Sequence, residues 1–166
     1  MRGATNSHPI FIPSIFCFGA SGTLGQNTDP ISLAYSRSND TNEEFFTFSN
    51  SKITIKKSGM YLVDFSLLGI FDTATRAQVS YSRNTNLYYS YQIGYVQALS
   101  GTQGINGSHV AKFTTGDTIG LTGWVASGSC SVSPNVEATH LRLTYLGEGG
   151  GRKLSLLRRL FRGRRS

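Results

Sequence analysis

The stretch from residue 52 to residue 65 alternates apolar and polar residues on both sides of a short polar break. Its alternating apolar positions are Ile53, Ile55, Tyr61, Val63 and Phe65. Strict alternation predicts strands that bury one face and expose the other. Gly59 lies in the break, where a glycine predicts a tight turn or a bulge because it adopts positive φ without a steric penalty. Two strands are therefore expected to meet at Gly59.

The remainder of the chain repeats this pattern in short pieces. Hydrophobic residues make up 39% of the 166 residues, charged residues only 15%, and there are 19 glycines. This composition and length predict one all-β domain, a jelly-roll sandwich of about eight to ten short strands separated by turns. Further strands are expected at 14–19, 31–35, 45–48, 77–83, 110–113, 119–125 and 140–146. Loops are expected at 21–30, 100–108 and 127–135.

The net charge of +7 is confined to one end of the sequence. Residues 1–151 contain equal numbers of basic and acidic residues, so all of the excess lies in 152–166. The basic residues there are Arg152, Lys153, Arg158, Arg159, Arg162, Arg164 and Arg165. A block of like charge beside a neutral domain is typical of an arm that binds polyanions. The alternative is a tail that only keeps the protein soluble.

The same tail has a helical apolar pattern. Leu154, Leu157, Leu160 and Phe161 recur at helical spacing, with arginines largely on the other side. A helix this short is unstable alone in water and is expected to order on a partner. Nucleic acid would contact the arginines, whereas an anionic membrane or an acidic protein groove would also accept the apolar side. The pattern leaves these three partners open.

Two further features concern the N-terminal region and the cysteines. Residues 9–20 have the composition of a signal-peptide core, but Pro13 interrupts them, and a first core strand after an extended arm at 1–13 is favoured. Cys17 and Cys130 are either bridged or buried as free thiols. Two cysteines in a chain of this size do not make a disulfide scaffold, so free thiols are favoured.

No pattern in the sequence indicates catalysis. His8, His109 and His140 lack metal-ligand spacing, and there is no nucleophile elbow or phosphate-binding loop. The glycine-rich segment 147–153 is interpreted as a linker, so that residues 148–166 form linker and tail. Asp117 follows Gly116 at an expected turn, where satisfying the turn backbone is favoured over calcium binding. We therefore expect no enzyme activity, cofactor, metal or small-molecule substrate.

Three segments in order resemble the C1q/TNF-like jelly roll across residues 14–147. Residues 59–65 fit its Gly-x-Tyr-x-x-x-Phe pattern, 113–121 its Gly-Asp segment, and 139–146 its final strand. The resemblance implies a ten-stranded sandwich that forms a tight homotrimer through aromatic and aliphatic faces. The residues it suggests for that interface are Phe65, Tyr88, Tyr89, Tyr91, Tyr95, Leu143 and Tyr145. The chain departs from the family in lacking a collagen-like stalk and in its basic extension.

Three functions are consistent with these observations. The favoured hypothesis is a self-assembling structural protein, such as a viral capsid protein or the spike or fibre head of a virion or similar particle. Its arginine tail would then bind nucleic acid or anchor the protein to the particle. The alternative is a secreted C1q/TNF-like trimeric recognition module or ligand. An enzyme on a jelly-roll scaffold is disfavoured, since it would need a His/Glu metal set that the sequence lacks.

Overall fold

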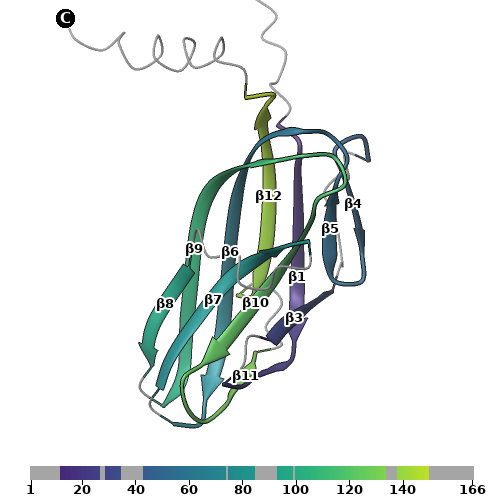
Figure 1. Ribbon diagram of the computed structural model, residues 1–166. Coiled ribbons are helices and arrows are strands. Elements are labelled where there is room, and N and C mark those ends of the chain that lie inside the picture. Colours follow the sequence, from purple (N-terminus) through teal and green to yellow (C-terminus); the bar gives the residue numbers. More distant parts are fainter. Residues whose placement is uncertain are drawn as a thin grey trace, which may run out of the picture.

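The computed structural model describes residues 12–26, 29–34, 43–73, 75–84, 93–98, 100–133 and 138–149. Every regular element within these ranges is a β-strand, and the strands form two packed layers (Figure 1). No helix among the described residues is long and apolar enough to span a bilayer. The strands are β1 (Ser14–Ser21), β2 (Thr23–Leu24), β3 (Asp29–Ala34), β4 (Phe46–Ser49), β5 (Lys52–Ile55), β6 (Gly59–Phe71), β7 (Thr75–Arg83), β8 (Ile93–Ala98), β9 (Gly101–Phe113), β10 (Thr118–Val125), β11 (Cys130–Val132) and β12 (His140–Gly147).

One layer is built on the long strand β6, and we call it the β6 sheet. Strand β9 pairs with β6 along its whole length, while β12 and β11 share the opposite edge of β6. Strand β1 pairs with β12, and all of these pairings are antiparallel. Figure 1 shows β9, β6, β12 and β1 side by side in this layer.

The second layer, the β10 sheet, has β10 at its centre. Strand β7 pairs with one edge of β10 and carries β8 on its other side. The opposite edge of β10 pairs with β3 and β5, and β4 lies beyond β5. Strand β3 also pairs with β1, so this strand joins the two sheets along one side of the sandwich. The predicted all-β jelly roll is confirmed, although with more strands than expected.

The core between the sheets is formed by the alternating residues that the sequence identified. Tyr61, Val63, Phe65 and Leu67 of β6 are completely buried, whereas the residues between them are not. At one end of the core the Tyr61 ring centroid lies 5.8 Å from that of Phe46 and 5.7 Å from that of Phe113. Aromatic rings at such separations stabilise each other beyond the area that they bury.

The turn between β4 and β5 has the geometry that its residues favour. Asn50 and Ser51 have φ of 49° and 60°, and Ser49 pairs with Lys52 across this two-residue loop. Positive φ at both central residues matches the right-handed twist of the paired strands. This turn joins the strand predicted at 45–48 to the alternating stretch that begins at residue 52.

The sequence correctly marked Gly59 as a strand boundary, but the tight turn or bulge predicted there is not found. Gly59 is the first residue of β6 and is not among the glycines with positive φ. Strands β5 and β6 lie in different sheets, so the break between them is a crossing rather than a hairpin. A Cβ atom at Gly59 would lie 2.5 Å from Cε2 of Tyr145 and 2.6 Å from the carbonyl oxygen of Gly147. Glycine is required here for close approach to β12.

The three predicted loops also contain strands. Residues 101–108 belong to β9, 130–132 form β11, and 23–24 and 29–30 belong to β2 and β3. Strand β9 has few large apolar side chains, and only Ile105 and Phe113 are buried in it. Gly107 lies opposite Phe65, and a Cβ atom there would be 2.5 Å from the Phe65 ring. Gly107, one of the glycines that indicated a loop, therefore leaves room for a core side chain.

We expect Gly107→Ala to lower the free energy of unfolding by about 1–3 kcal/mol, because the buried Phe65 ring cannot move away without overpacking the core. Gly104→Ala is the matched control on the same strand, since no atom lies within 4 Å of its added Cβ. It should be neutral or stabilise the fold by up to about 1 kcal/mol. Denaturant titration monitored by Trp124 fluorescence measures both, and equal stabilities would contradict this packing.

Candidate self-association face

The outward surface of the β6 sheet carries several large apolar side chains among polar and charged ones. In register, Val110, Leu62 and Thr144 form one row across β9, β6 and β12, and Ser108, Asp64 and Arg142 form the next. We call this surface the outer face and define it by Phe16, Phe18, Leu62, Asp64, Leu68, Ile70, Val110, His140 and Arg142. Antiparallel sheets that face water normally carry polar residues on that side.

The apolar part of the outer face lies on β6 and β9. Ile70 and Val110 each expose 47% of their surface, and Leu62 and Leu68 are half-buried. Leu62, Leu68 and Ile70 occupy positions of β6 that alternate with the core-facing residues. Exposed apolar side chains that share one sheet face are typical of an interaction surface.

The charged part of the outer face lies on β12 and β6, beside two phenylalanines of β1. The Arg142 guanidinium lies over the Phe16 ring, 4.8 Å from its centroid. The ring of His140 is 5.0 Å from the Phe16 ring, and its Nε2 atom is 3.9 Å from Oδ2 of Asp64. Phe18 packs at 5.3 Å from Phe16. These five residues, which we call the Phe16 cluster, combine aromatic surface with one acid and one permanent cation.

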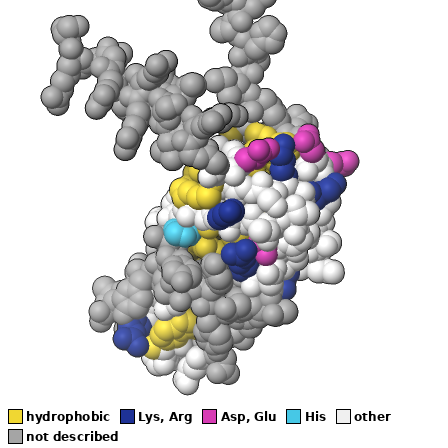
Figure 2. Space-filling view, turned by 45° about the horizontal axis from the view of Figure 1, so that its top comes forward, with side chains coloured by type: hydrophobic (Ala, Val, Ile, Leu, Met, Phe, Trp, Pro, Cys, Tyr) yellow, Lys and Arg dark blue, Asp and Glu magenta, His cyan; other side chains and the backbone are white. Residues whose placement is uncertain are grey.

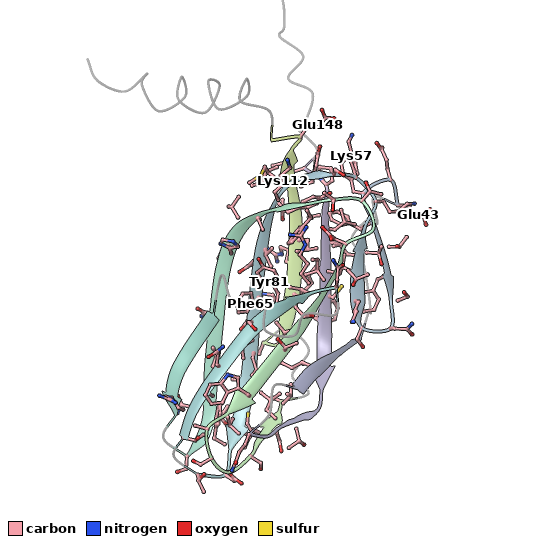
Figure 3. The ribbon with its side chains drawn as sticks, viewed as in Figure 1. Glu43, Lys57, Phe65, Tyr81, Lys112 and Glu148 are labelled. Atoms are coloured by element: carbon pink, nitrogen blue, oxygen red, sulfur yellow. The ribbon has the colours of Figure 1, made fainter. Side chains whose placement is uncertain are left out.

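Of the interface residues suggested by the sequence, the structure describes the side chains of three, Phe65, Leu143 and Tyr145. Phe65 and Leu143 are completely buried within the single chain, so neither presents surface to a second copy (Figure 3). Tyr145 is half-buried, with its ring 5.2 Å from that of Tyr61. Tyr95 belongs to β8, but its side chain is outside the described part of the structure. Tyr88, Tyr89 and Tyr91 also lie outside the described residues. The part of the interface suggestion that concerns these four tyrosines therefore stays a prediction.

The outer face was not predicted because the apolar residues on the outward side of β6 are interrupted by Asp64 and Ser66. Leu62, Leu68 and Ile70 lie between the core-facing residues, and Phe16 and Phe18 flank the buried Cys17. The signal that could have indicated it is the presence of apolar residues at both odd and even positions of one strand, because a strand covered on both faces has this pattern. The basic tail residues 152–165 lie outside the described residues, so their predicted role stays a prediction.

Charged side chains of the body gather at one end of the sandwich, where β12 ends (Figure 2). Figure 3 shows Glu43, Lys57, Lys112 and Glu148 at this end. The Lys57 ammonium lies 4.9 Å from the Phe45 ring centroid and 3.7 Å from a carboxylate oxygen of Glu44. This lysine is therefore engaged within the chain by a ring and an acid.

Asp117 satisfies the turn before β10, as predicted. Its Oδ2 atom accepts hydrogen bonds from the Thr114 amide at 2.7 Å and from Arg83 at 2.6 Å, and Oδ1 accepts one from Asn84 at 3.0 Å. Burial alone would raise the pKa of Asp117, but the hydrogen bonds from Arg83, Thr114 and Asn84 outweigh it and lower the pKa to about 2. No group of three potential metal ligands is found among the described residues.

We expect Asp117→Asn to lower the free energy of unfolding by about 2–3 kcal/mol, because it removes charge-assisted hydrogen bonds and leaves Arg83 half-buried without its carboxylate. Asp72→Asn is the matched control. Asp72 also accepts a hydrogen bond from a backbone amide, that of Ser129 at 2.9 Å, but it is exposed to solvent, so the loss should be clearly smaller than for Asp117→Asn.

The lowered pKa of Asp117 also sets a pH dependence. Its contribution is complete above the ordinary aspartate pKa of 3.8 and is lost as the pH falls through about 2. The stability difference between wild type and Asp117→Asn should therefore shrink in that acid range. A difference that stays constant between neutral pH and pH about 2 would contradict this assignment.

Both cysteines are buried free thiols, as expected. Burial raises the pKa of Cys17 to about 12. Burial likewise raises the pKa of Cys130, to about 11, and the Asp72 charge adds to this against a backbone hydrogen bond. Both side chains are therefore protonated at neutral pH and are poor nucleophiles.

Comparison with known proteins shows the fold. No protein-family model and no curated protein sequence matches the chain. Among solved structures, murine APRIL at pH 8.0 is 14% identical with a TM-score of 0.61, and the match covers 82% of this chain and 100% of that one. Eiger TNF from S. frugiperda is 12% identical with a TM-score of 0.61, covering 85% of this chain and 96% of that one. The chain therefore has the C1q/TNF-like jelly-roll fold, which confirms the resemblance at the level of fold.

Proposed function

We propose that this chain is a non-enzymatic recognition module that works as a homotrimer, in the manner of C1q/TNF-like ligands. The observation that carries the proposal is the outer face, an apolar and aromatic surface on a sheet that would otherwise face water. The fold supports it, because one of the similar structures is itself described as a TNF. Function does not follow from fold alone, so the outer face is the part to test.

The residues of the outer face replace Phe65 and Leu143 as the proposed interface. Burying Val110, Ile70 and the half-buried leucines against other copies removes apolar surface from water, which is the main favourable term in association. Phe16 and Arg142 supply the residue types that dominate interface energies. A repeated self-contact of this kind closes into a ring when the rotation between copies allows it, and the proposed ring contains three copies.

We expect the full chain to sediment at three times its mass of 18.1 kDa. Val110→Glu should weaken assembly at least about tenfold, because it places an uncompensated charge in the buried surface. Thr47→Glu is the matched control, since it puts the same acid at an exposed strand position of the β10 sheet.

Sedimentation velocity across a concentration series measures both variants, and circular dichroism confirms that each is folded. A single-chain mass for the folded wild type, or equal loss of assembly in the two variants, would contradict the proposed face.

A particle-associated function is the second candidate, and the observation that favours it is the position of the charge. All of the net +7 lies in residues 152–166, a concentration that a recognition module does not need. Arginine and lysine in such a block would bind phosphates with release of counterions. In this form of the proposal the trimeric body remains and the tail attaches it to nucleic acid or to another anionic surface.

Deleting residues 152–166 should abolish any nucleic acid that co-purifies at moderate salt, seen as a fall in the 260/280 nm absorbance ratio. A second variant replaces Leu154, Leu157, Leu160 and Phe161 with serine and keeps every charge. Nucleic-acid binding should survive this change, because it depends on the cations, whereas docking to a membrane or a protein groove should not. Wild-type protein free of nucleic acid at low salt would remove this candidate.

A further inference from the structure

We propose that the end of the sandwich where β12 ends docks on an anionic lipid membrane, with exposed apolar side chains of the body entering the lipid layer beside the basic tail. The inference rests on the second candidate function, because it names a lipid surface as the anionic partner of the tail. It does not require the trimer. What carries it is a set of body side chains that the charge of the tail leaves unexplained.

The side chains that would meet the lipid lie where the chain enters the tail. We call them the neck patch and define it by Ile12, Met60, Lys112 and Leu146. Met60 of β6 pairs with Lys112 of β9 on one side and with Gly147 of β12 on the other. The Tyr145 amide donates a hydrogen bond to the Pro13 carbonyl at 2.8 Å, which extends the pairing of β1 with β12 and places Ile12 beside Leu146.

Two apolar side chains of the neck patch are directed into solvent. The register between β12 and β6 shifts between Tyr145 and Gly147, so Leu146 is an extra residue in a β-bulge, and it exposes 51% of its surface. Bulges commonly redirect a side chain in this way. Ile12 exposes 56%, so the two most exposed of the large hydrophobic side chains in the described ranges lie at this one place.

The body meets the tail at the same end. Figure 1 shows β1 starting and β12 finishing side by side at this end of the sandwich. A Cβ atom on Gly149 would lie 3.0 Å from Cγ of Met60, so the chain passes over the neck patch as it leaves the body. Leu154, the first apolar residue of the tail, follows Gly149 by five residues and is therefore within about 18 Å of it. The apolar side of the tail and the neck patch can thus reach one continuous surface.

The charges at this end indicate what kind of surface that is. Within the body they balance, because three lysines accompany three glutamates: Lys56, Lys57, Lys112, Glu43, Glu44 and Glu148. Residues 152–166 then add seven basic residues and no acid. The net charge presented at the neck is that of the tail, and it favours an anionic partner.

A lipid surface satisfies both features together. Anionic headgroups attract arginine and lysine, and the boundary beneath them accepts the apolar side chains of an amphipathic segment. Nucleic acid would bind the same cations through its phosphates, but it offers no apolar layer for Ile12 and Leu146. A membrane also needs no preformed shape complementary to the neck patch, whereas a protein groove does.

The test measures binding of the full-length chain to vesicles by flotation, with phosphatidylcholine alone and with about 30% phosphatidylserine added. The wild type should bind the anionic vesicles at least about tenfold more tightly, and raised salt should weaken this binding. Equal binding to the two compositions, or none, would overturn the proposal.

The contribution of the neck patch is tested by combining Ile12→Ser with Leu146→Ser. Because both side chains are exposed in the single chain, this double variant should stay folded by circular dichroism, yet bind anionic vesicles at least about fivefold more weakly. Ile12→Val with Leu146→Met is the matched control, since it changes shape at the same positions and keeps both apolar. It should bind the vesicles as the wild type does.

The outcomes separate this inference from the function on which it rests. Equal binding by the serine variant and the wild type would overturn the role of the neck patch and leave attachment through the tail standing. A full-length chain that binds a single-stranded oligonucleotide but neither kind of vesicle would assign the tail to nucleic acid and overturn the lipid partner. A chain that binds neither would remove the second candidate function, and this inference with it.

Discussion

The ladder between β6 and β9 is the interaction on which the rest of the structure depends. It runs without interruption from the Gly59–Phe113 pair to the Phe71–Gly101 pair. Because β6 is held along one complete edge, its other edge is free to receive β12 and β11 in succession, and β12 in turn positions β1. The core-facing residues of β6 then pack between the layers. A shift of this ladder by one residue would turn those side chains to the outside.

Of the two strands in this ladder, the sequence pattern predicted β6 well and β9 poorly. Strand β6 was predicted because Tyr61, Val63 and Phe65 alternate, and the turn at Asp117 because Gly116 precedes an acid that can accept local hydrogen bonds. Only the end of β9, residues 110–113, was predicted as a strand, and its first part was predicted as a loop. In that first part Gly107 leaves space for the Phe65 ring, so the core-facing side of the strand lacks a large apolar side chain there. Local propensity indicated a loop, and pairing with a complete neighbouring strand outweighed it.

The outer face shows a different limit. Alternation tells which residues share a side of a strand, but it identifies the inside only when the two sides differ in polarity. On β6 the outward side mixes Leu62, Leu68 and Ile70 with Asp64 and Ser66, so its polarity does not mark a surface. The family resemblance suggested Phe65 for an interface, whereas its side chain is buried in the single chain, and Leu62 and Val110 were not singled out. The Phe16 cluster could not be foreseen either, because it joins residues from β1, β6 and β12 that are far apart in the sequence. The basic tail, by contrast, could be recognised without any structural pattern, because all of the excess positive charge lies in residues 152–166.

The pairing of β1 with β12 has a consequence for synthesis on the ribosome. Ile15 lies opposite Leu143, so the middle of the β6 sheet is assembled from segments translated at very different times. Until residues 140–147 emerge, both β1 and one edge of β6 have unsatisfied backbone groups, which invite pairing with neighbouring nascent chains. On a polysome such chains are identical and close together. The interval before β12 appears is thus the period of greatest exposure to misassembly, and slower elongation through residues 114–139 would lengthen it.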